Sequence, residues 1–176
     1  FTFTVPTVTA NTDYTLSIPA GAIKYNNDNQ NGAQNITLHT PAIFDGTYYL
    51  YNPYFDLFLG RGKDWGTAAV VDKYGIPFNL VTSGDGKSNI QFVDNSGYLF
   101  GTGWSWADGG SPGDYYRISA QTVGNYAGYA LYNQGLTENN RLYAFYKDGN
   151  ADNYRVAGNA IIGDNCTNAE QTVWLF

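Results

Sequence analysis

Two tryptophans occupy matching places in two similar stretches of the chain. Trp65 ends "GRGKDW" (60–65) and Trp106 ends "GTGWSW" (101–106), each five residues after a glycine, Gly60 or Gly101. An indole offers a flat apolar face and one N–H donor. Sugars have apolar C–H faces that stack on such a ring, and nearby Asp, Asn or Gln side chains accept hydrogen bonds from sugar hydroxyls. The pair therefore indicates carbohydrate-binding chemistry.

Polar and aromatic neighbours complete this candidate site. Asp64 adjoins Trp65. Trp106 has Trp104, Ser105 and Asp108 close to it in sequence. The alternative is that the indoles pack against neighbouring loops or against strands near the N-terminus. The expected ligand-binding residues are Trp65, Asp64, Trp104, Trp106 and Asp108.

Catalytic chemistry is not indicated. A nucleophilic serine or cysteine needs a base within reach, but the one histidine, His39, is far in sequence from the one cysteine, Cys166. Glycoside hydrolysis needs two facing carboxylates, whereas most aspartates here adjoin Gly or Asn, as in Asp85-Gly86, which is typical of turns. We expect neither an enzyme nor a cofactor.

One segment has part of the spacing of a calcium loop. "DGNADN" (148–153) places Asp148, Asn150 and Asp152 at alternate positions. The sixth position is Asn153 and the twelfth is Asn159, where such a loop carries Gly and Glu. We expect a solvated hairpin loop and no metal.

Composition narrows the class of protein. The 176 residues suit one domain, or one domain plus a fragment. A net charge of −6 with only nine scattered basic residues disfavours a nucleic-acid partner, and no apolar run approaches the roughly 18 residues of a membrane helix. The chain begins with Phe1 and has no Met, which indicates a trimmed piece of a longer protein. Its content of Tyr, Thr, Asn and Gly is typical of secreted β proteins.

The elements that must position these residues are short strands in a repeated order. "YYLYN" (48–52) precedes "LFLGRGKDWG" (57–66), "NIQFVDN" (89–95) precedes "YLFGTGWSWA" (98–107), and "YALYN" (129–133) precedes "LYAFYKDGN" (142–150). In this alignment Gly60, Gly101 and Ala144 coincide. Each unit closes on another apolar strand, within 76–84, 114–124 or 171–176, and third strands lie between, clearest at 67–72 and 155–163.

Three units of about 40 residues with four strands each predict a β-trefoil of about twelve strands over residues 46–176. One unit cannot bury its own aromatic face, whereas three units around a common axis share one core. The third unit has Gly149 at the tryptophan position. A core residue is expected in all three units, so Trp65 and Trp106 are expected at the surface, on the loop after the second strand.

Residues 1–45 differ from the repeats. Alternating runs at 1–5, 13–21 and 35–40 predict three half-buried strands, with Tyr14, Leu16, Ile18, Ile36 and Leu38 on the apolar faces. Three strands are too few for a sandwich of about seven. They either pack on the repeats or form the end of an incomplete sandwich domain.

The stretches 46–80 and 156–176 resemble β-trefoil modules of secreted or surface multidomain proteins of gut bacteria and, more distantly, the ricin-type lectin superfamily. "YTLSIPAGAI" (14–23) and "NITLHT" (35–40) are similar to the closing strands of the immunoglobulin-like modules that often precede such trefoils. The resemblance implies a trefoil that binds carbohydrate. The ricin-type Gln-x-Trp has one near match, from Gln171 to Trp174, which is one residue longer.

Together these observations predict a non-catalytic binding module, secreted or at the cell surface. Its expected partners are a glycan or cell-surface polysaccharide and the other modules of a larger parent chain, without nucleic acid or membrane insertion. The alternative is a structural spacer or protein-interaction module that has no small-molecule ligand. A trefoil protease inhibitor is disfavoured because no long loop carries an obvious reactive site.

Overall fold

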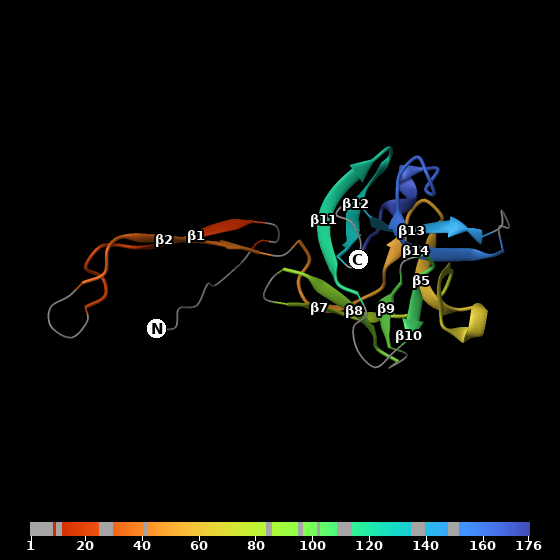
Figure 1. Ribbon diagram of the computed structural model, residues 1–176, viewed down its shortest axis with the longest axis horizontal. Coiled ribbons are helices and arrows are strands. Elements are labelled where there is room, and N and C mark those ends of the chain that lie inside the picture. The colour runs from red at the N-terminus through yellow and green to blue at the C-terminus, as the bar shows by residue number, and fades with distance from the viewer. Residues whose placement is uncertain are drawn as a thin grey trace. The chain divides into compact units, whose positions relative to one another are not determined.

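The structure is a computed structural model of residues 1–176, and it describes residues 9, 12–24, 30–40, 42–83, 86–94, 97–101, 103–108, 114–134, 140–147 and 152–176. The chain divides into two compact units, Phe1–Ile43 (unit 1) and Phe44–Phe176 (unit 2). Regular structure in the described residues consists of antiparallel strands and short 3-10 turns, without an α-helix (Figure 1). The prediction of an all-β chain is confirmed.

The described residues of unit 1 form a β-hairpin. β1 (Asp13–Ile18) pairs antiparallel with β2 (Gln34–His39) in unbroken register. Tyr14, Leu16 and Ile18 are half-buried, as the alternating sequence predicts, whereas Ile36 and Leu38 are 43% and 45% exposed. A hairpin of two strands supplies no second layer that would cover an apolar face. The strand expected at residues 1–5 lies outside the described residues.

Among its described residues, unit 2 has twelve short strands and two 3-10 turns. The first six strands are β3 (Gly46–Tyr48), β4 (Tyr51–Asn52), β5 (Leu57–Gly62), β6 (Ala68–Asp72), β7 (Phe78–Thr82) and β8 (Ser88–Phe92). The others are β9 (Tyr98–Phe100), β10 (Trp106–Asp108), β11 (Tyr116–Val123), β12 (Tyr126–Asn133), β13 (Arg141–Tyr146) and β14 (Tyr154–Ala160). The turns are η1 (Asp64–Gly66) and η3 (Ala169–Thr172).

Some of these strands pair in one long antiparallel succession. β3 pairs with β7, β7 with β8, β8 with β11 and β11 with β12. Two isolated bridges extend the succession, from Tyr129 of β12 to Trp174 and from Leu175 to Tyr51 of β4. The amide of Tyr51 donates to the carbonyl of Leu175 at 2.9 Å, and the reverse bond is 2.8 Å. The last residues of the chain therefore lie between β12 and β4.

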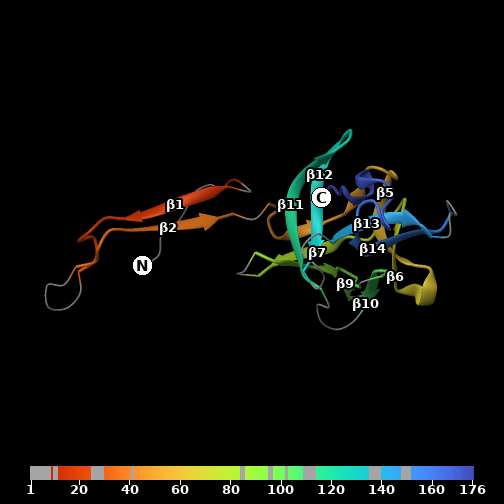
Figure 2. The ribbon, with the colours of Figure 1, turned by 45° about the horizontal axis from the view of Figure 1, so that its top comes forward.

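Three hairpins, β5–β6, β9–β10 and β13–β14, are made of strands that neighbour one another in sequence (Figure 2). Backbone bonds join the hairpins to each other. The amide of Ala69 donates to the carbonyl of Ser105, and the amide of Ser105 donates to the carbonyl of Val156, both at 2.8 Å. The hairpins that carry Trp65 and Trp106 are thereby held beside each other and beside β14.

The core of unit 2 is apolar and aromatic. Among its largest fully buried side chains are Trp174, Tyr116, Phe78 and Phe92. The indole N–H of Trp174 donates to the carbonyl of Leu142 at 3.0 Å, so the polar atom of this buried ring is satisfied. Trp174 is thus a core residue, in contrast to the other tryptophans.

The final strand starts later than predicted. Gln171 and Thr172 belong to η3, and extended pairing begins at Trp174. The side chain of Asn168 accepts a bond from the amide of Glu170, and the side chain of Gln171 accepts one from the amide of Asn168. These caps satisfy backbone donors that a turn leaves free. The prediction of strand at residues 171 and 172 is therefore wrong.

Candidate functional site

Trp65 and Trp106 stack on each other. Their ring centroids lie 5.3 Å apart with 23° between the ring planes. Trp65 belongs to η1 and is 87% exposed. Trp106 is the first residue of β10 and is partly buried, so it lies on a strand and not on the predicted loop. Since so much of the Trp65 indole is in water, the face that points away from Trp106 remains open to a ligand.

The turn that carries Trp65 has an unusual backbone. Lys63 has φ 57° and ψ −128°, and Trp65 has φ 53° and ψ 12°. Positive φ crowds a side chain against its own backbone and costs about 1–3 kcal/mol at residues other than glycine. A bond from the amide of Gly66 to the carbonyl of Lys63, 2.9 Å long, closes the turn. The chain thus holds an indole in water on a strained turn.

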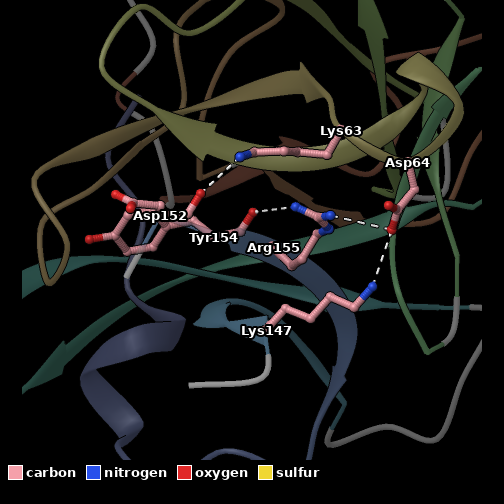
Figure 3. Close-up of polar contacts among 6 residues, drawn as sticks. All are labelled: Lys63, Asp64, Lys147, Asp152, Tyr154 and Arg155. Atoms are coloured by element: carbon pink, nitrogen blue, oxygen red, sulfur yellow. Dashed lines mark hydrogen bonds and ion pairs between the residues drawn. The ribbon is translucent and has the colours of Figure 1, made fainter. Parts of the chain in front are cut away.

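Asp64 anchors this turn to the opposite hairpin. Its Oδ2 lies 3.3 Å from Nζ of Lys147 and 3.3 Å from a guanidinium nitrogen of Arg155 (Figure 3). The Asp64 side chain is 38% exposed, whereas that of Arg155 is 2% exposed. The hydrogen bond from Lys147 contributes most to lowering the pKa of the Asp64 carboxyl from its ordinary value; burial opposes it, and the bond from Arg155 adds to the lowering. The expected ligand residue Asp64 thus already has two cationic partners.

Trp104 shares one of these cations. The ammonium of Lys147 lies 3.7 Å from the centroid of the Trp104 ring, which is 38% exposed. A cation over an indole face is attracted by the π-electron density. Lys147 therefore links Asp64 to Trp104, next to the tryptophan pair. Asp108 pairs through its backbone with Tyr98 in β9, and its side chain lies outside the described part of the structure.

A pocket of about 340 Å³ begins at the same turn. Lys63 lines it, and Nζ of Lys63 donates to the backbone carbonyl of Asp152 at 2.8 Å (Figure 3). Apolar residues of β5 and β6 and the side of Tyr154 provide much of its wall. The residues that line it are Leu57, Arg61, Gly62, Lys63, Val70, Val71, Asp72, Lys73, Asp152 and Tyr154.

Lys63, Lys147 and Arg155 were not singled out from the sequence. A signal existed for the two lysines, because "KD" occurs at 63–64 and again at 147–148, each lysine three residues after an aligned position, Gly60 or Ala144. The same alignment matches Lys147 to Trp104, which it contacts. Arg155 had no such signal, because its partner Asp64 is 91 residues away in sequence.

The other residues considered for catalysis or metal binding are not brought together in a site. Cys166 is buried in unit 2, and burial raises the pKa of its thiol, while His39 belongs to unit 1. The segment with part of a calcium-loop spacing, where we expect a solvated loop and no metal, falls largely on residues 148–151, which lie outside the described residues. Within the part of the chain that the structure describes, no three His, Cys, Asp or Glu side chains are placed to hold a metal ion.

Comparison with protein-family models, curated proteins and solved structures finds no match to this chain. Among the described residues, no helix has the length and apolar character needed to cross a membrane.

Proposed function

We propose that unit 2 is a β-trefoil. Twelve short strands divided among the three repeats, β3 to β7, β8 to β11 and β12 to β14, support this fold. So does the pairing, which runs from β3 through β7, β8, β11 and β12 to the C-terminal residues and from them back to β4. Aligned positions of the repeats also meet in pairs, Trp65 with Trp106 and Lys147 with Trp104. A crystal structure in which three segments of about 40 residues superpose by threefold rotation is the test.

We further propose that unit 2 binds carbohydrate and has no catalytic role. The observation that carries this proposal is the 87% exposure of Trp65, stacked on Trp106. An indole left in water forgoes about 3 kcal/mol of burial energy, and the positive φ of Trp65 adds strain. Packing gives no reason to keep such a residue there. A sugar ring that stacks on the open indole face gives one.

The proposed setting is a surface or secreted protein with several modules, in which residues 1–45 end an immunoglobulin-like domain. A single shallow site of this kind buries little area, so its affinity for one sugar chain is expected to be weak. Linked copies on a parent protein or on a polysaccharide would raise the overall affinity through effective concentration.

The test is binding to an array of glycans and polysaccharides by the intact chain and by Trp65→Ala. The matched control is Tyr115→Ala, which removes an aromatic ring that is 39% exposed elsewhere on unit 2. We expect Trp65→Ala to abolish binding while its circular dichroism stays unchanged, and Tyr115→Ala to bind normally. Absence of glycan binding by the intact chain, or equal binding by Trp65→Ala, would leave the structural-spacer function as the better explanation.

A further inference from the structure

The pocket beside the tryptophan pair gathers cations in a chain that is acidic. Arg61, Lys63 and Lys73 line it, and Lys147 and Arg155 flank Asp64 next to it. These are five of the nine basic residues of a chain whose net charge is −6. An anion is repelled over most of such a surface, so a local group of cations defines where it can bind.

The cations of the pocket are not all neutralised by its carboxylates. Lys63 donates to a backbone carbonyl, and Lys73 lies over the ring of Tyr74, 4.7 Å from the centroid, so both contact neutral groups. Arg61 reaches Asp94 only at 3.9 Å. Oδ1 of Asp72 accepts bonds from the amides of the turn after β6, at 2.8 and 2.9 Å. Those bonds leave the charge of Asp72 in place, so the lining carries three cations against two carboxylates, Asp72 and Asp152, and keeps a net charge of +1.

The remaining wall of the pocket suits a sugar ring. Leu57, Val70 and Val71 supply apolar surface, and Tyr154 supplies an aromatic side. A volume of about 340 Å³ is at the small end of ligand sites. Lys63 lies two residues before Trp65, which puts their Cα atoms at most about 7 Å apart. One short oligosaccharide can therefore contact both the indole and the pocket.

We propose that this pocket is a second subsite of the glycan site and selects a sugar unit that carries a carboxylate or a sulfate. The inference rests on the proposed carbohydrate binding and adds the class of ligand. Lys63 and Lys73 provide the charge-assisted bonds to the anionic group, and the apolar wall contacts the ring. Trp65 stacks on a neighbouring sugar ring of the same oligosaccharide.

The experiment measures binding to two matched pairs of polysaccharides: polygalacturonate with its carboxyl-reduced form, and a sulfated galactan with its desulfated form. The proteins are the intact chain, Lys63→Gln/Lys73→Gln, Trp65→Ala, and the control Lys87→Gln/Arg117→Gln. The control makes the same change of net charge outside the pocket, so it separates a local effect from a general one.

We expect the intact chain to prefer the acidic member of at least one pair by about 5- to 10-fold at low salt, because two exposed ion pairs contribute about this much. The preference should shrink in 0.5 M salt, which screens charges beyond about 4 Å. Lys63→Gln/Lys73→Gln should lose the preference and keep neutral binding, and the control should keep both. A preference within the polygalacturonate pair identifies a carboxylate as the anionic group that the pocket binds, and one within the galactan pair identifies a sulfate.

Equal binding of acidic and neutral forms by the intact chain overturns this inference and leaves the proposed function standing, provided that Trp65→Ala still abolishes binding. Failure of the intact chain to bind either acidic polysaccharide overturns it as well, whatever neutral glycan the array identifies. A preference that survives Lys63→Gln/Lys73→Gln also overturns it, because the charge would then act elsewhere on the chain.

Discussion

The carboxylate of Asp64, on an exposed turn, lies 3.3 Å from the guanidinium of Arg155, whose side chain is 2% exposed. The contact joins residues 91 positions apart in sequence. A buried cation is stable only when it is paired, so the turn that carries Trp65 is tied to the folding of β14. The order of the candidate binding site therefore depends on an ion pair between two hairpins.

Asp64→Asn should lower the thermal midpoint of unfolding, because it leaves the Arg155 cation without its carboxylate. Arg155→Met should lower the midpoint too, and the double variant should recover part of the loss, since removing both charges leaves no unpaired ion. Differential scanning calorimetry of the four proteins gives the coupling. Strictly additive single effects would show that the two side chains do not interact.

Acid should weaken the fold through the same carboxyl. The bond from Lys147, with Arg155, holds the pKa of Asp64 below its unfolded value. Its contribution to stability is then complete above about pH 4 and is lost as the pH falls through the lower, folded-state pKa. Urea unfolding at a series of acid pH values should show a smaller loss for Asp64→Asn than for the intact chain. An equal loss of stability with acid in the two proteins would show that Asp64 is not the group responsible.

Trp65→Gly should be more stable than Trp65→Ala by about 1 kcal/mol. At φ 53° an alanine keeps the clash between β-carbon and backbone, and a glycine does not. Denaturant unfolding of both variants measures the difference. Neither variant should bind glycan, because both lack the indole. Equal stability of the two would mean that the turn relaxes to another conformation.

Trp174→Phe should lower stability and leave glycan binding unchanged, in contrast to the Trp65 variants. It removes the N–H that donates to the carbonyl of Leu142 within the core, which should lower the free energy of unfolding by about 2 kcal/mol. Glycan affinity of the folded protein should be unchanged, because Trp174 is fully buried. Urea unfolding and array binding of the same sample check both parts. A loss of affinity at full folding would place Trp174 in the site.

Most strands of unit 2 could be predicted because their information is local. Alternating apolar residues set off by Gly, Asn and Asp identify segments such as 67–72 and 155–163, which match β6 and β14 closely. The prediction for the end of the chain was wrong because "QTVWLF" has the same alternating pattern as the strands. Asn168 caps the turn η3, which includes the first two of these residues. The threefold arrangement stays a proposal, supported by the pairing.

For the candidate site, repeat spacing predicted that Trp65 and Trp106 are equivalent and that Trp65 is exposed. It does not predict the distance between the two rings. Their stacking follows from backbone bonds between hairpins, such as that from Ala69 to Ser105. The burial of Arg155 was beyond prediction for a similar reason. A charged residue in a strand is expected to face water, and only the fold brings Asp64 to it.

The bridge between Tyr51 and Leu175 has a consequence for how unit 2 would behave as a module of a longer chain. Tyr48 and Phe176 also touch edge to face, with centroids 5.6 Å apart, so both ends of the unit leave it at neighbouring points. A unit built in this way tolerates insertion into a surface loop of another protein, or circular permutation at the Gly124–Asn125 turn.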